Sequence, residues 1–400
     1  MRNLIKEKSF EYLIYFLIAS LFFSKAFPNI VLAVLSVLTI IGFKKLQFFK
    51  TKFTFSSTVI LLILLLFLTV KSIAFGTLSY NFKVYKGLFL AFWLAIVFKK
   101  VTNFKMLKLV LLWSINAAVL SCALLISLFY FKHHVLPFSN TAEVNELLIL
   151  ERPYMGFITV LGVFLALEKS CFVIKFKSLW VINAVLLFLF ILLISARISI
   201  ITLFLLAIIY LIFYAKISWL KKGMFLVTFV VVFVLIVVTN KNISERFFVK
   251  SNLEESLKVA SDYEPRIVIW NCAYSMTQKS DFNSLIGFDG YNEISNNFLN
   301  CYANTIENPS KKEYFLTEKF NSHNQFIDFY LIGGSIGLLL FLAFFIQLWR
   351  EVRTNFFHTA IAFSFLLFFC VENIFYRQFG CYLFGIFILI LLQRKTNEEN

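Results

Sequence analysis

The stretch that decides the fold runs from Ser322 to Arg350 and reads SHNQFIDFYLIGGSIGLLLFLAFFIQLWR. A helix needs roughly 20 predominantly apolar residues to cross the hydrocarbon core of a bilayer, and residues 325–349 meet that length. His323 and Asn324 stand at the mouth of this segment. Small residues that permit close helix packing follow one to three turns deeper: Gly333, Gly334 and Gly337. The stretch therefore predicts a membrane-spanning helix with polar groups at one end.

Apolar segments of this kind recur along the whole chain. Eleven more are predicted, near residues 10–24, 26–43, 55–70, 82–98, 106–131, 153–167, 178–195, 198–214, 223–239, 356–375 and 379–392. Of 400 residues, 60% are hydrophobic, 53 are Phe and only 15% are charged, whereas soluble domains carry about 25% charged residues. This composition excludes an ordinary cytosolic enzyme, a disordered protein and a collagen-like fibre. We expect an all-α polytopic membrane protein with about 12 transmembrane helices.

The distribution of Lys and Arg predicts the orientation. With the N-terminus inside, 21 of the 38 basic residues fall in short inner loops and tails, eight in short outer loops and nine in residues 240–324. Because basic residues mark the cytoplasmic side, both termini are expected inside. The predicted parts are 1–239, 240–324 as a large, partly helical outer loop between helices 9 and 10, and 325–400. The first apolar segment lacks a clear cleavage site and is interpreted as an anchor.

The net charge of +16 therefore does not indicate nucleic acid. The outer loop holds 11 of the 22 acidic residues, so the basic excess lies chiefly on the cytoplasmic face. Cys272 and Cys301 both lie in this loop, where an oxidising compartment would permit a disulfide, but sequence leaves their pairing open. The chain has no Cys/His pattern with zinc spacing and no calcium loop, so we expect no metal or other cofactor.

Two arginines stand out on the predicted outer side. Arg197 lies in the short connection ISARISII (194–201), at a depth where a charge is costly without a partner; the alternative is an interfacial anchor. Arg266 and Trp270 lie four residues apart in YEPRIVIW (263–270), a spacing that places them on one helical face. Pro265 suits the first turn of that helix. A surface helix whose Trp packs on the membrane is the structural alternative.

Titratable groups follow at the ends of the later spans. His323 has a side chain whose ordinary pKa lies near neutrality, which suits proton transfer. Glu372 lies near the outer end of the 356–375 segment, and Arg377 follows five residues later. Arg377 could neutralise Glu372, which is a structural interpretation of that pair.

In this order, the residues resemble the O-antigen ligase and O-antigen polymerase superfamily of bacterial membrane glycosyltransferases. The resemblance rests on an Arg between two spans with an Arg-x3-Leu-like pattern (Arg197 to Ile201), on Arg-x3-Trp in a large outer loop, and on His-x10-Gly (His323 to Gly334). The turn IGFDGY at 286–291 is similar to the family's Gly-x-Gly turn, with its glycines one residue further apart. The resemblance covers roughly residues 150–390.

The resemblance implies a multi-pass protein of the bacterial inner membrane that transfers a glycan from undecaprenyl pyrophosphate to an acceptor hydroxyl in the periplasm. It implies His323 as a base and Arg197 and Arg266 as pyrophosphate ligands, since Arg grips phosphate oxygens with a planar fork. Weaker candidates for substrate binding or for shaping the site are Asn324, Trp270, Glu372 and Arg377. Because arginines would supply the positive charge that a metal ion supplies in other enzymes, a metal-independent reaction is expected.

Several alternatives stay open at this point. The acceptor could be lipid A core (ligation, slightly favoured), another glycan (polymerisation) or a protein, and the sugars cannot be inferred. A transporter of polysaccharide or lipid-linked sugar is the alternative from another class, although we find no internal repeats, mid-span charges or broken helices of the kind that transporters show. A scaffolding protein would leave the loop motifs unexplained.

Overall fold

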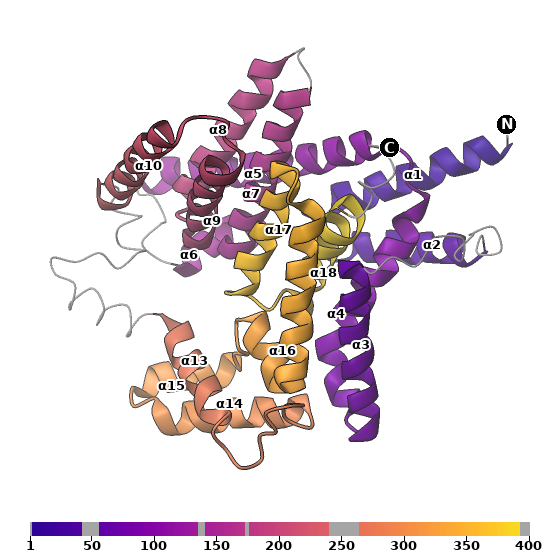
Figure 1. The fold of residues 1–400 in the computed structure, drawn as a ribbon, viewed down its shortest axis with the longest axis vertical. Coiled ribbons are helices and arrows are strands. Elements are labelled where there is room, and N and C mark those ends of the chain that lie inside the picture. The colour runs from indigo at the N-terminus through magenta and orange to yellow at the C-terminus, as the bar shows by residue number, and fades with distance from the viewer. Residues whose placement is uncertain (1, 42–55, 135–140, 173–175, 240–263, 393–400) are drawn as a thin grey trace. The chain divides into compact units, whose positions relative to one another are not determined.

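The computed structural model describes residues 2–41, 56–134, 141–172, 176–239 and 264–392. Among these residues every regular element is a helix (Figure 1). The chain divides into two compact units. The first unit contains Met1–Phe49, Val97–Ser256 and Asn355–Ser364, and the second contains Lys50–Ile96, Leu257–Thr354 and Phe365–Asn400. The predicted division into residues 1–239, 240–324 and 325–400 follows the membrane topology, and it stays a prediction. The two compact units divide the chain at other positions.

The first unit is built around one helix. α7 (Arg152–Phe172) packs against α5 (Phe104–His133), α8 (Lys177–Leu193) and α9 (Arg197–Ile209), and 83% of its spanning window is buried. Gly156 makes the close approach to α9 possible, because a Cβ there would run into Ala196 and Ser199. The unit also contains α1 (Arg2–Ser20), α2 (Phe27–Ile41), η2 (Phe98–Lys100), α6 (Thr141–Leu147), η3 (Tyr210–Tyr214) and α10 (Trp219–Thr239).

The second unit joins apolar helices to a group of polar ones. α16 (Gln325–Val352) packs along α3 (Ser57–Ala74). The helices α13 (Pro265–Met276), α14 (Tyr291–Thr305) and α15 (Pro309–Glu318) lie together (Figure 1). The remaining elements are α4 (Leu78–Val97), η4 (Ile374–Tyr376), α18 (Gln378–Phe384) and η5 (Gly385–Leu392). α17 (Phe356–Phe369) starts in the range of the first unit and ends in that of the second.

A disulfide between Cys272 and Cys301 joins α13 to α14, with a Cα–Cα distance of 5.8 Å. This answers the question that the sequence left open. Pro265 occupies the first turn of α13, as predicted, where its missing N–H costs no helical hydrogen bond. The disulfide therefore fixes a helix that carries two candidate residues, Arg266 and Trp270.

α16 is broken at Gly334, whose φ of +58° is left-handed, a break that the sequence did not indicate. The loop at 284–288 fills the break. The N–H groups of Ser335 and Ile336 donate to the carbonyls of Ser284 and Leu285, at 2.8 and 3.2 Å. Buried N–H groups freed by a break must find acceptors, and this loop supplies them.

Lys71 on α3 holds the same junction from the other side. Its side chain is buried, and its Nζ donates to the carbonyl of Phe288 in the loop and to that of Ile332 on α16, the latter at 2.6 Å. An ammonium group in an apolar surrounding needs such acceptors, because an unsatisfied charge there is strongly unfavourable. Lys71 thus ties the turn at 286–291 to the helix below His323.

Phenylalanine forms much of the core of the second unit. Rings of α16, α17, η4 and α18 contact one another in tilted and edge-to-face geometry, with centroids 5.0–5.8 Å apart for the pairs Phe341–Phe369, Phe369–Phe384 and Phe375–Phe384. Such pairs add to the stabilisation from burial itself. The many Phe residues therefore bind the last helices to α16 and fix the segment that carries Glu372.

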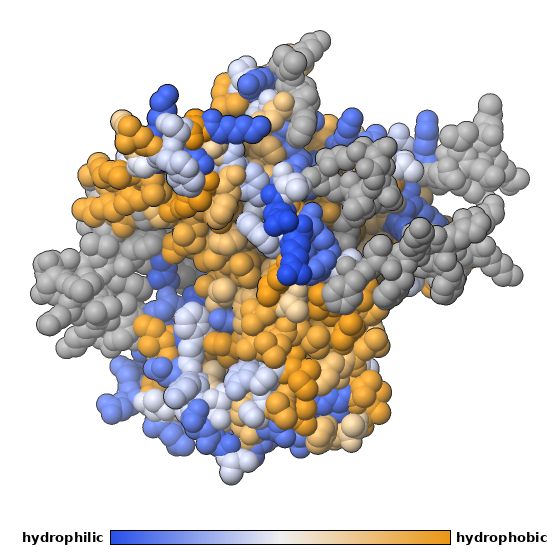
Figure 2. Space-filling model, in the orientation of Figure 1, coloured by the Kyte–Doolittle hydropathy of each residue, from blue (hydrophilic) through white to orange (hydrophobic). Residues whose placement is uncertain are grey.

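Within the described residues, each of the twelve predicted apolar segments is largely helical, and the segment at 356–375 is interrupted at residues 370–373. Among the described residues, six helices are long and apolar enough to cross a membrane, and four shorter ones are apolar. The chain is therefore a multi-pass membrane protein, and its count of twelve spans stays a prediction. Large apolar side chains remain exposed, for example Trp113, Leu128 and Leu339, as expected for surfaces that face lipid. Figure 2 shows broad hydrophobic areas, with hydrophilic residues gathered over α13 to α15.

Candidate functional site

A buried carboxylate organises the predicted site residues of the second unit. α17 ends at Phe369, earlier than the predicted 356–375 segment, and residues 370–373 link it to η4. Glu372 lies in this link with its side chain only 7% exposed. Arg266 and His323 contact it, and Glu264 pairs with Arg266; we call these four residues the Glu372 cluster. It joins three segments that are distant in sequence.

Arg266, in the first turn of α13, contacts three acceptors within the protein, and its side chain is 23% exposed. Its Nη2 lies 3.2 Å from Glu372 Oε1, and its Nη1 lies 3.0 Å from Glu264 Oε1. Its Nε donates to the carbonyl of Val371 at 3.2 Å. A guanidinium group that already has two carboxylates and a carbonyl as partners fixes the position of those groups. The sequence suggested Arg377 as the residue that neutralises Glu372; the structure shows direct contact of Glu372 with Arg266, and Arg377 also lies near enough to lower the pKa of Glu372.

His323 approaches Glu372 from the loop before α16. Its Nδ1 lies 3.6 Å from Glu372 Oε2, within ion-pair distance and longer than a hydrogen bond. This nitrogen is buried and has no hydrogen-bond partner, while the side chain as a whole is 21% exposed. The exposed part of the side chain therefore lies away from Nδ1. The residue adopts φ +44°, a left-handed conformation that costs energy and that is typical of functional sites.

The charge state of Glu372 follows from its neighbours. Burial alone would raise the pKa of this carboxyl. The His323 imidazole and two guanidinium groups, those of Arg266 and Arg377, outweigh burial and hold the pKa below its ordinary value of 4.5. Glu372 is therefore a carboxylate at neutral pH and places a negative charge beside the buried nitrogen of His323.

Trp270 and Asn324 support the loop that carries His323. The indole Nε1 of Trp270 donates to the carbonyl of Ser322 at 3.0 Å. The side chain of Asn324 caps α16 by accepting from the N–H groups of Phe326 and Ile327, at 2.9 and 3.1 Å. Of the two interpretations of Trp270, sugar stacking or structure, these contacts favour structure.

Asp328 forms a second polar group beneath this loop, which the sequence interpretation missed. The carboxylate is 1% exposed, and its Oδ2 accepts from the Tyr376 hydroxyl at 2.7 Å. Ser322 contacts Asp328 Oδ1 at 3.4 Å and accepts from Asn373 Nδ2 at 3.0 Å. Each of these neighbours is next to a candidate residue in sequence. Ser322 precedes His323, Asn373 follows Glu372, and Tyr376 precedes Arg377. A lone acid inside an apolar segment was the signal that could have revealed it.

Arg197 and Arg377 complete the predicted residues. Arg377 lies close enough to Glu372 to lower its pKa. Arg197 belongs to the first unit, where it begins α9, whereas the Glu372 cluster is built from the second unit alone. The predicted role of Arg197 as a pyrophosphate ligand therefore stays a prediction. Within the described part of the chain, no group of three or more His, Cys, Asp or Glu side chains is arranged to hold a metal ion.

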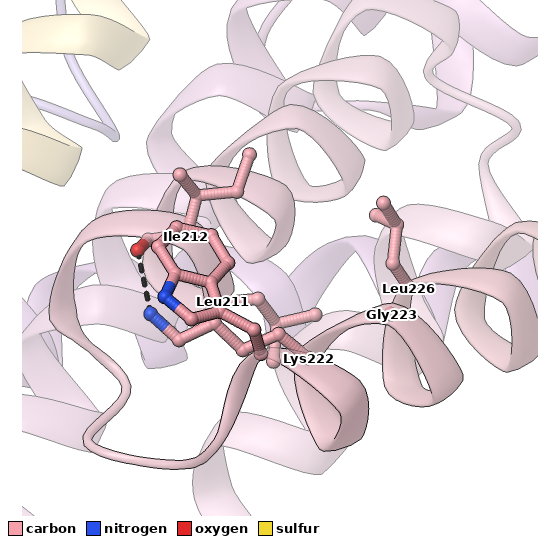
Figure 3. Close-up of a pocket in the computed structure, with 6 residues that line it drawn as sticks. Leu211, Ile212, Lys222, Gly223 and Leu226 are labelled. Carbon is pink, nitrogen blue, oxygen red and sulfur yellow. Dashed lines mark hydrogen bonds between the residues drawn. The ribbon is translucent and has the colours of Figure 1, made fainter.

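A small pocket lies elsewhere, in the first unit, at η3 and the start of α10 (Figure 3). It is lined by Leu211, Ile212, Trp219, Lys222, Gly223 and Leu226. Lys222 Nζ donates to the carbonyl of Ile212 at 2.8 Å (Figure 3). No candidate site residue lines this pocket, so it does not belong to the predicted chemistry.

The fold and the cluster define a class: a multi-pass helical membrane protein in which a polar helical region holds a histidine and an arginine against a buried carboxylate. Residues 182–342 match the protein-family model described as O-Antigen ligase. This match confirms the predicted resemblance to the O-antigen ligase and polymerase superfamily and supports glycan transfer in general. No curated protein matches the chain. The matched segment includes Arg197, Arg266 and His323 and ends before Glu372.

Proposed function

We propose that this protein transfers a glycan from undecaprenyl pyrophosphate to an acceptor hydroxyl at the periplasmic face of a bacterial inner membrane, with both termini in the cytoplasm. Ligation of O-antigen to lipid A core during lipopolysaccharide biosynthesis is the leading reaction, and polymerisation and protein glycosylation use the same chemistry. The observation that carries the proposal is the Glu372 carboxylate beside the buried Nδ1 of His323. The family match supports glycan transfer in general.

In this proposal His323 is the base. The carboxylate of Glu372 favours the tautomer with the proton on Nδ1, which leaves Nε2 free to accept a proton. The acceptor oxygen attacks the anomeric carbon of the donor sugar while Nε2 takes the hydroxyl proton. The bond between that carbon and the pyrophosphate oxygen breaks, and undecaprenyl pyrophosphate leaves with the electron pair. General base catalysis of this kind contributes about 10²–10⁴-fold.

The contacts of Arg266 favour a positioning role over direct binding of pyrophosphate. Its guanidinium group balances Glu264 and Glu372, so it keeps Glu372 ionised and in place for His323. Arg197 keeps the role of pyrophosphate ligand that the family resemblance implies. Asn324 and Trp270 hold the His323 loop, and Arg377 adds positive charge near Glu372.

The break in α16 bears on the transporter alternative, since transporters use broken helices to bind substrates and ions. Here the N–H groups of Ser335 and Ile336 are taken by carbonyls of the loop at 284–288. Lys71 donates hydrogen bonds to the carbonyl of Phe288 in the loop and to that of Ile332 on α16. Because the protein itself satisfies these groups, the break favours a structural junction, and transfer remains the better supported function.

The test replaces His323 by Ala in the full-length protein and measures glycan transfer. His134 offers a matched control, because it is also a histidine with a left-handed backbone, at φ +55° and exposed. We expect His323→Ala to lose about 10²–10⁴-fold of transfer and His134→Ala to keep it. Normal transfer by well-expressed His323→Ala would overturn the proposal.

Deletion followed by gel analysis of surface polysaccharide separates the acceptors. Loss of all long chains on lipid A core indicates ligation. A single repeat on the core indicates polymerisation. Unchanged lipopolysaccharide with altered glycoproteins indicates the protein-directed reaction.

A further inference from the structure

Two aromatic side chains, on α15 and on the loop that follows it, form a row that ends at His323. The ring of Phe320 lies 5.6 Å from the imidazole of His323, measured between centroids, with the two planes tilted by 53°. The ring of Tyr314 lies 5.3 Å from that of Phe320 in edge-to-face geometry. Tyr314 is 52% exposed, and Phe320 is partly exposed. We call Tyr314 and Phe320 the aromatic pair.

A buried aromatic core holds Phe320 in place from one side. The ring of Phe315, which is 1% exposed, lies 5.1 Å from that of Phe320. Tyr302 on α14 is fully buried and contacts Phe315 with its ring, while its hydroxyl donates to the carbonyl of Phe320 at 3.1 Å. These contacts fix both the ring and the backbone of Phe320. Its exposed surface is therefore already formed in the absence of a ligand.

The backbone between the aromatic pair and the histidine is also fixed. Lys319 and His323 both adopt the left-handed conformation, at φ +51° and +44°. Non-glycine residues keep this unfavourable conformation only where the surrounding structure determines it, which is typical of functional sites. Between them, the carbonyl of Ser322 accepts from the indole of Trp270 at 3.0 Å. The segment 319–323 is therefore a fixed bend that holds Phe320 against the imidazole.

A sugar ring suits a surface of this kind. The faces of a pyranose consist largely of C–H groups, which pack on an aromatic ring, whereas its hydroxyls project from the edge toward polar groups. The buried Nδ1 of His323 lies near Glu372, and the exposed part of the histidine lies away from that nitrogen. A sugar that packs on the aromatic pair would lie next to this exposed part. One of its hydroxyls could then reach the imidazole.

The alternative is an anchor at the membrane surface, since Tyr is enriched at membrane–water interfaces. An anchor requires exposure alone. It requires neither the buried support of Phe315 and Tyr302 nor a left-handed bend, and it gains nothing from contact between Phe320 and His323. These additional features favour a ligand over an anchor.

We infer that Tyr314 and Phe320 form a binding site for a sugar ring of the acceptor. This inference rests on the proposed function, in which His323 takes the proton of the acceptor hydroxyl. The aromatic pair then has the sugar-stacking role that the sequence interpretation considered for Trp270. It also makes the acceptor a carbohydrate, so that transfer to a sugar hydroxyl is favoured over transfer to a protein side chain.

The experiment uses the saccharide obtained by deacylating lipopolysaccharide from the deletion strain, which carries the acceptor sugars after loss of either ligation or polymerisation. Its binding to the purified full-length protein in detergent is measured without a donor. We expect Phe320→Ala to weaken binding about 10-fold and Tyr314→Ala about 3-fold, as the loss of aromatic contacts predicts. Tyr274→Ala is the matched control, because Tyr274 on α13 is also an exposed aromatic residue, at 70%. Wild-type affinity in Phe320→Ala, or no binding by the wild-type protein, overturns the site.

Two substitutions separate stacking from packing. Phe320→Trp keeps an aromatic ring and should bind within about 3-fold of wild type, whereas Phe320→Leu keeps apolar volume without a ring and should lose as much affinity as Phe320→Ala. Wild-type affinity in Phe320→Leu would overturn the stacking role. If Phe320→Ala fails to fold, Phe320→Leu and the exposed Tyr314→Ala decide the matter, and wild-type affinity in both overturns the site.

A third measurement separates the acceptor from the donor and the site from the proposed function. Farnesyl pyrophosphate serves as a short analogue of the donor carrier, and Phe320→Ala should keep the affinity for it while KM for the acceptor rises. An equal loss of affinity for both compounds overturns the assignment to the acceptor. Saccharide binding that depends on Phe320, in a protein that transfers no glycan, supports the sugar site and contradicts the proposed function. Normal transfer with an unchanged acceptor KM in Phe320→Ala contradicts the site alone.

Discussion

The two units place arginine in opposite situations. In the second unit, Arg266 contacts two carboxylates and a carbonyl. In the first, Arg152 is more deeply buried, and its guanidinium group has no hydrogen-bond partner among the described residues. The difference separates two situations of the same side chain. An arginine between two carboxylates orders the protein around it, whereas a buried arginine without acceptors carries an uncompensated charge.

The largest effect is expected when the negative charge of Glu372, on which the Glu372 cluster depends, is removed. Glu372→Gln keeps the shape of Glu372 but leaves the buried Nδ1 of His323 without a negative charge. We expect transfer to fall about 10²–10⁴-fold and the affinity for farnesyl pyrophosphate to stay unchanged. Glu318→Gln, an exposed position on α15, serves as control. A fall in affinity equal to the fall in transfer would contradict the distinction between Arg152 in the first unit and the Glu372 cluster in the second.

The next effect concerns stability and tests the comparison directly. Arg266→Leu leaves two carboxylates without their partner and should lower the free energy of unfolding by about 2–4 kcal/mol. Arg152→Leu removes an unpaired buried charge, so the ligand-free protein should unfold at the same temperature as wild type or higher. Thermal unfolding in detergent measures both variants. A greater loss of stability in Arg152→Leu than in Arg266→Leu would contradict the contrast between an unpaired Arg152 and a paired Arg266.

A smaller effect is expected beneath the His323 loop. Asp328→Asn weakens the contacts to Tyr376 and Ser322, which flank the Glu372 cluster in sequence. Because Asp328 acts only through these neighbours, we expect kcat to fall about 10-fold with KM unchanged. Asp281→Asn, an exposed position, is the control. Equal changes in kcat and KM would indicate a contact with the substrate instead.

The smallest effect is a pH dependence of stability. The pKa of Glu372 is lower in the folded protein than its ordinary value of 4.5. Its contribution to stability is therefore complete above pH 4.5 and is lost as the pH falls through the folded pKa. The difference in unfolding temperature between wild type and Glu372→Gln should stay constant from pH 7 to about 5 and shrink below 4.5. A difference that grows on acidification would contradict the assigned charge state.

The sequence was sufficient for the helices and for several residues of the cluster. Apolar segments of membrane length predict helices because the bilayer leaves backbone groups no other partners. Arg266, His323 and Glu372 stood out because charged and titratable groups are rare in such a chain. Their pairing could not be predicted, since Arg266 and Glu372 are 106 residues apart and meet only through packing of α13 against the link after α17.

Other features left too little signal in the sequence. Arg152 resembles any basic residue at the start of a span, and only its burial without partners distinguishes it. Gly334 lies in an apolar run in which a glycine indicates close packing as readily as a break. Its left-handed conformation depends on the loop at 284–288, which no local pattern connects with α16.

That junction has a consequence for how the chain can change. Gly287 and Gly334 are both left-handed, and a Cβ on either would collide with backbone of the other segment. No substitution on one side can make room for a side chain on the other, because the obstacle is backbone. Grafting the polar helical region from a related chain should therefore succeed only when α16 is transferred with it as one cassette.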